Sequence, residues 1–253
     1  MKTVFDKVYC ITLEENVERQ NNIKHILNDI YNIDFEFIYA FPFYKSVYSG
    51  LFDNDKVIPF GNYDYNGNVY IDYDNGRSLS IYIANYCAAV NAYKQGINRL
   101  LIIEDDICLY KDVNLVEKYF NEIPEDVDII RYGYNICFDE DKVNYIKSTN
   151  TDYWQDNENK QDKSGAQMFA LMNRNTIKIY YENIAKTLTG GDNPYNTFIN
   201  NEYNLNIYYS IQNLALDHIT YEYIINNETP PMGYYPFDVE TIKKNINNYF
   251  KNE

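Results

Sequence analysis

Residues 100–106 read Leu-Leu-Ile-Ile-Glu-Asp-Asp, four aliphatic side chains followed directly by three carboxylates. Such an aliphatic run is typical of a strand buried on both faces, as in the centre of an α/β sheet. Neighbouring carboxylates repel, and at the carboxyl end of a strand, where open α/β sheets bind ligands, they indicate a bound cation. Oxygen ligands suit Mg²⁺ or Mn²⁺, which take further ligands from phosphates. The alternative is that the acids simply begin a solvated turn.

The first forty residues predict a strand, a helix and a second strand. Residues 8–13 and 35–40 have strand character, and the segment from Glu15 between them has helical periodicity. Apolar side chains at i, i+3, i+4 and i+7 give this helix one buried face: Ile23, Ile26, Leu27 and Ile30. A strand-helix-strand opening favours a parallel sheet.

The rest of the chain alternates in the same manner. We expect a hairpin between 63–65 and 69–71, and a helix capped by Ser78 or Ser80 that ends at Gly96. A polar loop is predicted over 147–163. Further helices are predicted over 112–122, 175–188 and the tail from 239, and further strands over 127–130, 165–172 and 206–211. The pattern therefore predicts the α/β class, with a mixed, mostly parallel sheet flanked by helices.

Charge and composition exclude several classes of partner. The formal net charge of −15 disfavours nucleic acid and anionic membranes, which need clustered Lys and Arg. No apolar run reaches the length of about 18 residues that a transmembrane helix needs, and residues 1–6 lack the apolar core of a signal peptide. The four cysteines are scattered, so we expect buried free thiols. A soluble protein of the cytoplasm, with no transmembrane segment, is the expectation.

Three residues outside the acidic run each allow two interpretations. Arg19, early in the first helix, forms either a surface salt bridge or a contact with an anion. Trp154 is the single tryptophan and sits in the polar loop, where it is either a packing anchor or a sugar-stacking lid residue. Asp192 or Asn193 is expected to cap a helix that begins at Pro194, and for Asp192 this role does not exclude catalysis.

Several segments, taken in order, resemble glycosyltransferase family 25, the lipooligosaccharide-type and procollagen galactosyltransferases. They are Ile11-Thr12-Leu13 with Arg19, 35–40, Leu79-Ser80, 101–107, 165–171 and Asp192. The match of 101–107 to the family's "LILEDD" sequence is the specific part. Two departures are Thr12-Leu13, where the family usually has Asn-Leu, and Ala84-Asn85, where it has Ser-His.

The resemblance implies a single GT-A-like domain over 1–253, with a nucleotide-sugar-binding half (1–110) and an acceptor-side half (111–253). It implies transfer of a hexose from a UDP-sugar, most commonly UDP-galactose, to a hydroxyl of a glycan or protein acceptor. Inversion at the anomeric carbon and a divalent cation, Mn²⁺ or Mg²⁺, are also implied.

The resemblance also implies roles for individual residues. Asp106 would bind the metal, Glu104 and Asp105 would contact the ribose or sugar or orient the site, and Asp192 would be the general base. His218 is either a further metal ligand or a structural histidine. The remaining expected donor contacts are Thr12, Leu13, Arg19 and Trp154.

Two other functions remain open at this point. A sugar nucleotidyltransferase also holds metal on acids at a sheet edge, but no Gly-rich phosphate loop follows the first predicted strand. A carbohydrate-binding or adaptor protein with weak or no turnover would keep the fold, and the missing Ser-His pair favours it. Turnover of UDP-sugars with Mn²⁺ separates these possibilities.

Overall fold

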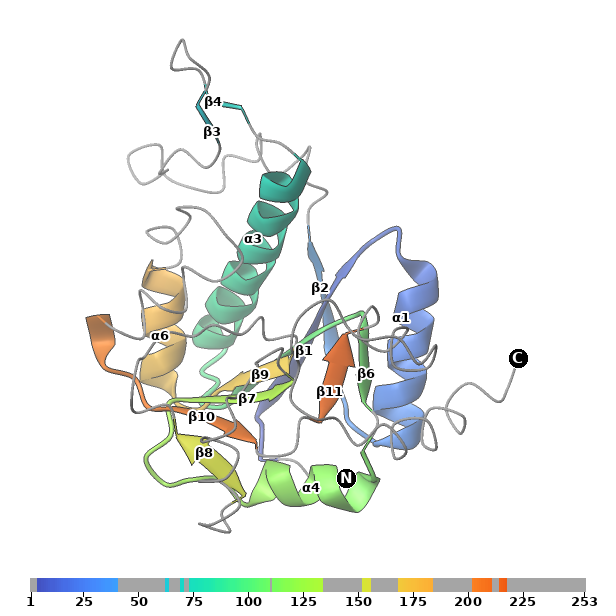
Figure 1. Cartoon of the computed structure of the whole chain (residues 1–253), viewed down its shortest axis with the longest axis vertical. Helices are drawn as coiled ribbons and strands as arrows, with labels where there is room; N and C mark the ends of the chain where they lie inside the picture. The colour runs from blue at the N-terminus through green and yellow to red at the C-terminus, as the bar shows by residue number, and fades with distance from the viewer. Residues whose placement is uncertain are drawn as a thin grey trace, which may run out of the picture.

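The computed structural model describes residues 4–40, 62–63, 69–70, 73–109, 111–133, 152–155, 168–183, 202–210 and 214–217 (Figure 1). The predicted tail helix from residue 239 lies outside these ranges, as do Asp192 and His218.

A mixed sheet forms the centre of the described part of the protein (Figure 1). Its strands follow the order β2-β1-β5-β9-β7-β10-β8, and β11 pairs with β7 and with β6. Strands β1, β2, β5, β7, β10 and β11 run in one direction, and β6, β8 and β9 run in the other. The expected mixed, mostly parallel sheet is confirmed. Its strands are β1 (Lys7–Leu13), β2 (Glu36–Ala40), β5 (Leu100–Glu104), β6 (Ile107–Leu109), β7 (Ile129–Gly133), β8 (Tyr153–Gln155), β9 (Met168–Leu171), β10 (Ile207–Ser210) and β11 (Ala215–Asp217).

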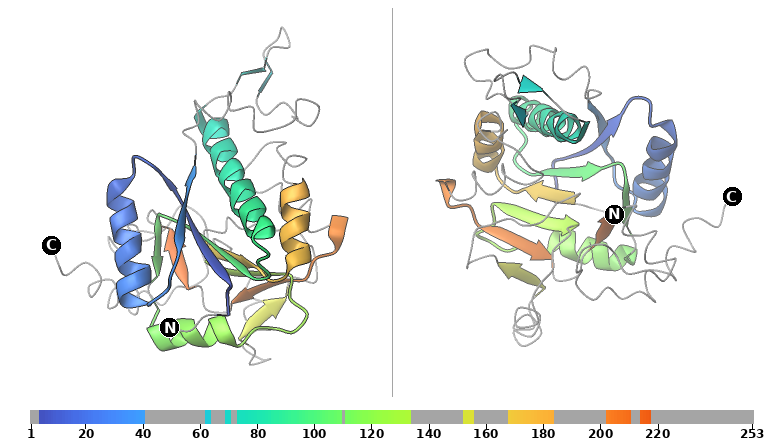
Figure 2. Two further views of the ribbon diagram at one scale, coloured as in Figure 1. Left: turned by 180° about the vertical axis from the view of Figure 1, so that it is seen from behind. Right: turned by 45° about the horizontal axis from the view of Figure 1, so that its top comes forward.

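Helices cover both faces of this sheet (Figure 2). Helices α3 (Tyr73–Lys94) and α6 (Arg174–Asn183) lie on one face. Helix α1 (Val17–Lys24), its π-helical continuation η1 (His25–Ile30) and α4 (Val113–Asn121) pack on the other. A hydrophobic core lies on each face of the sheet, and β5 contributes to both because its side chains alternate. Leu100 and Ile102 face α3, and Leu101 and Ile103 face α1. None of the helices in the described ranges is long and apolar enough to cross a membrane.

The sequence located most of these elements correctly. Strands β1 and β2 pair in parallel as expected, and the predicted hairpin is the small sheet of β3 (Asn62–Tyr63) and β4 (Val69–Tyr70). Helix α4 begins where predicted because the Asp112 carboxylate accepts a hydrogen bond from the backbone N of Asn114 at 2.9 Å. Strand β5, from the first predicted half of the chain, pairs with β9 from the second, so one sheet joins both halves.

The predicted start of α3 was wrong. The helix begins at Tyr73, so Ser78 and Ser80 lie inside it rather than at its N-terminus, and Asn75-Gly76, a typical turn dipeptide, is helical. A local turn preference of about 1 kcal/mol for Gly is easily outweighed by burial of a whole helix face. The buried part of that face is rich in small side chains, which let the helix lie close to the sheet: Ala84, Ala88, Ala89 and Ala92.

The prediction of a continuous loop over 147–163 was also wrong at its centre. Residues 153–155 form edge strand β8, antiparallel to β10, with Trp154 opposite Tyr209. The strand is held by Tyr153, whose hydroxyl donates to the backbone oxygen of Tyr119 in α4 and whose ring meets the Tyr119 ring edge-on at 5.4 Å. These tertiary contacts give a polar segment a strand conformation that its composition does not favour.

Three tyrosines, Tyr132 buried and Tyr153 and Tyr208 partly buried, should make this part of the fold sensitive to alkali. Burial raises the pKa of Tyr132 and of Tyr153, and burial with the hydrogen bond to Asp126 raises the pKa of Tyr208 to about 12. Between pH 10 and 12 the unfolded chain therefore loses protons that the folded chain keeps, and the free energy of unfolding falls as pH rises. Urea denaturation should show a lower midpoint at pH 11.5 than at pH 9, and less of a difference in Tyr153→Phe. Equal midpoints at the two pH values would contradict this.

Candidate active site

The three carboxylates lie at the carboxyl end of β5, beside the carboxyl ends of β1 and β2. Strand β5 ends at Glu104, opposite Ile11 of β1, and Asp105 and Asp106 form the turn to β6. Parallel strands bring their carboxyl ends to the same edge, which is where open α/β sheets bind ligands. The last two residues of β1, Thr12 and Leu13, lie at this edge as well.

Strand geometry divides the three acids between the two faces of the sheet. Side-chain alternation along β5 assigns Glu104 to the face of Leu100 and Ile102, under α3. Asp105 instead bonds to Thr12 and Arg19, toward α1. One cation held by all three carboxylates is therefore disfavoured, and Asp105 with Asp106 forms the acid pair of the site.

Asp105 is fixed in place by β1. Its side chain is 9% exposed, and Oδ2 accepts a hydrogen bond from Thr12 Oγ1 at 2.5 Å. Its backbone N donates to the carbonyl oxygen of Ile11 at 3.1 Å. Thr12 thus supplies a hydroxyl donor to a nearly buried carboxylate and fixes the direction of that side chain.

Arg19 reaches both members of the acid pair. Its Nη1 lies 3.4 Å from Asp105 Oδ1 and 3.5 Å from Asp106 Oδ2, and the Arg19 side chain is half exposed. The β1–α1 loop is held by Gln20, whose Nε2 donates to the backbone oxygens of Leu13 at 2.8 Å and Glu14 at 3.2 Å. Arg19 was expected to form either a surface salt bridge or a contact with an anion. The structure shows salt bridges, and their partners are Asp105 and Asp106 of the candidate site.

The Cys10 thiol lies buried beneath this cluster. Burial and the nearby charges of Asp105, Glu104 and Asp106 raise its pKa well above the ordinary value. The thiol is therefore neutral at pH 7 and suited neither to metal binding nor to nucleophilic attack. The expectation of buried free thiols is confirmed for Cys10 and Cys108; Cys87 is free and partly buried.

The donor set suits a cation that arrives with phosphate. Within the described ranges no group of three His, Cys, Asp or Glu side chains is arranged to hold a metal ion. Mg²⁺ is commonly held by only one or two carboxylates, with substrate phosphates and water completing its shell. Asp105 already accepts from Thr12 and Arg19, whereas the Asp106 side chain is 30% exposed. Asp106 is therefore the better placed of the pair to ligate a cation.

Of the three remaining expected site residues, only Trp154 belongs to the described part of the chain, and its strand lies away from this edge. Asp192 and His218 lie outside the described residues. Trp154 belongs to β8, and β9, β7 and β10 lie between that strand and β5, which puts the two strands roughly 19 Å apart at the usual strand spacing.

Sequence reasoning missed two residues: Gln20, which holds the β1–α1 loop, and Arg131, a buried charge on β7, two strands away from β5. Arg131 of β7 is 0% exposed, and its guanidinium carbon lies 5.2 Å from the centre of the Phe169 ring. Register places Arg131 opposite Phe169, which is itself opposite Ile102, so the arginine shares the α3 face with Glu104. An arginine directly after Ile129-Ile130 was the available signal, since a buried strand rarely carries a charge.

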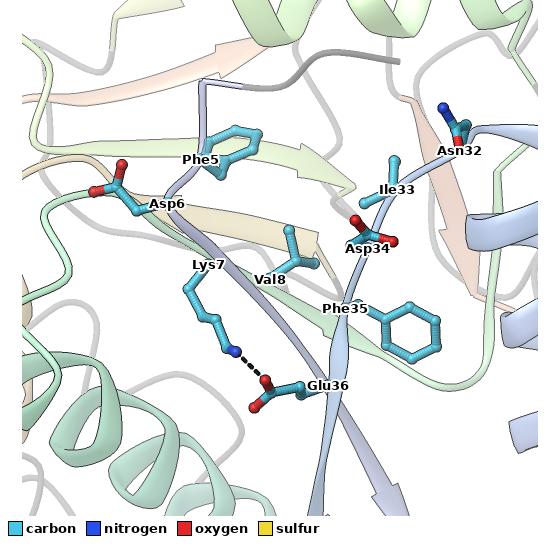
Figure 3. A pocket seen from close by; sticks show the side chains of 9 residues that line it. All are labelled: Phe5, Asp6, Lys7, Val8, Asn32, Ile33, Asp34, Phe35 and Glu36. Carbon is cyan, nitrogen blue, oxygen red and sulfur yellow. Dashed lines mark hydrogen bonds and ion pairs between the residues drawn. The ribbon is translucent and has the colours of Figure 1, made fainter.

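The cavity shown in Figure 3 lies at the other end of the same strands. Its volume is about 340 Å³, and its lining includes the ion pair between Lys7 and Glu36. Both residues begin their strands, whereas Thr12 and Asp105 lie where the strands end. This cavity is therefore separate from the acid pair. It is lined by Phe5, Asp6, Lys7, Val8, Asn32, Ile33, Asp34, Phe35 and Glu36.

Comparison of the chain with protein-family models and with curated proteins gives no match. The resemblance to glycosyltransferase family 25 therefore depends on the motifs quoted above, and the activity that it implies is a proposal.

Proposed function

We propose that this chain is a metal-dependent glycosyltransferase that moves a hexose, galactose or glucose, from a UDP-sugar to a hydroxyl of a glycan or protein acceptor. The observation that carries the proposal is the acid pair at the carboxyl end of central strand β5, with Thr12 and Arg19 from β1 and α1 against it. Its position at the ligand-binding edge of an α/β sheet and the family-like sequence of 101–107 both support this function.

Each residue of the site then has a chemical task. Asp106 would ligate a divalent cation, which when bound neutralises charge that develops on the leaving diphosphate. Asp105, held by Thr12, orients the site, and Arg19 contributes a cation for phosphate oxygens. Glu104, on the α3 face, is available to the ribose or the sugar. Leu13 completes the end of β1 beside them.

The transfer is a single displacement at the anomeric carbon. The acceptor hydroxyl oxygen forms a bond to that carbon while the bond to the phosphate oxygen breaks, and UDP leaves with the electron pair. The proton of the acceptor passes to a general base, a role for which Asp192 remains the sequence-based proposal. Attack opposite the leaving group gives inversion. His218 as a second metal ligand, Trp154 as a donor contact and a cytoplasmic location also stay predictions.

Donor binding tests the proposal directly. UDP-galactose, UDP-glucose and UDP-N-acetylglucosamine, each with and without Mn²⁺, are compared by thermal shift with the matching GDP-sugars. Binding to the folded state at 100 times Kd adds about 2.7 kcal/mol of stability. We expect one UDP-sugar to raise Tm only when Mn²⁺ is present, and to be slowly hydrolysed. No shift and no hydrolysis with any UDP-sugar would contradict the proposal.

One observation favours the second candidate, a carbohydrate-binding or adaptor protein without turnover. The family's Ser-His pair is replaced by Ala84-Asn85, and both residues are buried on the sheet side of α3. An adaptor would bind sugar without any dependence on Mn²⁺ and would release no UDP. A nucleotidyltransferase would instead release pyrophosphate from UTP and a sugar 1-phosphate.

A further inference from the structure

Arg19 forms a bridge between two carboxylates that must otherwise share one small space. Asp105 and Asp106 are adjacent in sequence and carry two negative charges, and Nη1 of Arg19 lies within 3.5 Å of an oxygen of each. The guanidinium comes from a different element, α1, whose first turn is tied to the end of β1 through Gln20. The arginine thus occupies the side of the acid pair that a cation approaching from α1 would use.

The ion pairs between Arg19 and the two carboxylates are weak enough for a ligand to replace them. The two N···O distances, 3.4 and 3.5 Å, are longer than the 2.7–2.9 Å of a strong charge-assisted hydrogen bond. The Arg19 side chain is 49% exposed, so water and salt screen the attraction. Asp105 retains its bond to Thr12 if the arginine moves away. Displacement of Arg19 therefore costs little and leaves the more buried carboxylate in place.

We infer that Arg19 is the resident counter-cation of the acid pair, and that a divalent cation enters only together with a diphosphate, which takes over the guanidinium. This inference rests on the proposed function and names the ligand of that site as a divalent cation–diphosphate complex. A bare divalent ion on Asp105 and Asp106 meets the positive charge of Arg19 at close range and is repelled. A diphosphate removes that penalty, because its oxygens accept the planar guanidinium in two parallel hydrogen bonds and also ligate the metal.

The inference predicts two effects of opposite sign for one substitution. In Arg19→Gln, affinity for Mn²⁺ alone should rise at least 10-fold, because a like charge is removed from the cation's site. Affinity for UDP in the presence of saturating Mn²⁺ should fall at least 10-fold, because the diphosphate loses its arginine. A merely structural role for Arg19 would weaken both. Mn²⁺ binding is followed by electron paramagnetic resonance of free Mn²⁺, and UDP binding by calorimetry.

Lys24→Gln is the matched control. Lys24 lies on the same helix, its substitution changes the net charge equally, and its ammonium lies over the Phe37 ring, 5.5 Å from the ring centre. Neither affinity should change more than 2-fold. Arg19→Lys retains the charge without the planar fork, so Mn²⁺ affinity should stay at the wild-type value while UDP binding weakens.

The outcomes separate this inference from the function that it rests on. Unchanged or weaker Mn²⁺ binding in Arg19→Gln, with an unaltered circular dichroism spectrum, overturns the counter-cation role. If the variant fails to fold, stronger Mn²⁺ binding in Arg19→Lys overturns it instead, since charge is retained there. If the wild-type protein does not bind UDP in the presence of Mn²⁺, the proposed function is wrong. The Mn²⁺ affinities of the wild type and of Arg19→Gln, measured without UDP, still decide whether Arg19 is the counter-cation of the acid pair.

Discussion

Asp106→Ala should lose metal-dependent turnover of the UDP-sugar by at least about 100-fold and keep its fold. The carboxylate lies in the turn after β5 and is 30% exposed, so its removal opens no cavity in the core. A metal ligand makes a larger contribution than an outer residue that orients one, and loss of such an outer residue already costs about 10–100-fold. UDP release with Mn²⁺ present measures the effect, and the thermal midpoint of the unliganded variant monitors the fold.

Two variants make this result specific to the acid pair. Asp106→Asn keeps the shape of the side chain and removes its charge, and should lose nearly as much activity as the alanine variant. Asp29→Asn removes one charge from the exposed surface of η1, where Asp29 pairs with His25, and should retain full activity. Wild-type turnover by Asp106→Asn would exclude the carboxylate as the metal ligand and remove the basis of the proposed chemistry.

The sequence predicted the framework of this site because local patterns determine it. The aliphatic run at 100–103 requires a strand with two buried faces, and β5 alternates between the two hydrophobic cores. The periodicity at Ile23, Ile26 and Leu27 required a helix face against the sheet, and all three are buried. The pairing of β1 with β5, which sets Ile11 opposite Glu104, was not predicted, because it joins segments far apart in the sequence.

The parts that the sequence did not reveal depend on tertiary contacts. Edge strand β8 exists because Tyr153 bonds to α4, and α3 extends to Tyr73 because a helix packed along a sheet outweighs a local turn signal. Arg19 forms a hydrogen bond with Asp105, which lies 86 residues away in the sequence, so no local pattern could indicate it. The opposite directions of Glu104 and Asp105 were foreseeable from the two-residue repeat of a strand, although the three acids in a row suggested a single cluster.

The two edges of the sheet have different roles. At the carboxyl edge of β1 and β5, a weak and exposed ion pair leaves charged groups available to a ligand. At the other end of the parallel strands, Asp128 lies directly before β7, and its carboxylate accepts three hydrogen bonds. Substitution of Asp128 should therefore lower the stability of the fold, whereas substitution of the acid pair should weaken ligand binding.

Asp128→Ala should lower the free energy of unfolding by about 3–5 kcal/mol. One oxygen accepts from Asn173 Nδ2 at 2.8 Å and Thr176 Oγ1 at 3.2 Å, and the other accepts from the backbone N of Asn206 at 2.9 Å. The carboxylate thus joins the beginnings of β7, α6 and β10, and Thr176 is 0% exposed. Thr176 Oγ1 keeps its bond to Asn173 Oδ1 at 3.0 Å, whereas Asn173 Nδ2 and the backbone N of Asn206 lose this acceptor. Each buried group left without a partner costs about 1–3 kcal/mol, and the sum is less than additive.

Urea denaturation and thermal midpoints measure this loss, which is a large fraction of the roughly 5–15 kcal/mol that stabilises a typical protein. Asp128→Asn keeps one carbonyl acceptor and should lose about half as much. Asp126→Ala, two residues earlier, removes an exposed carboxylate that accepts from the Tyr208 hydroxyl, and should cost less than about 1 kcal/mol. The increase in thermal midpoint on adding UDP-sugar and Mn²⁺ should persist in Asp128→Asn, because Asp128 lies at the edge opposite the acid pair. If Asp128→Ala were no less stable than Asp126→Ala, the three bonds would contribute nothing to the fold, and the division of roles between the two edges would be wrong.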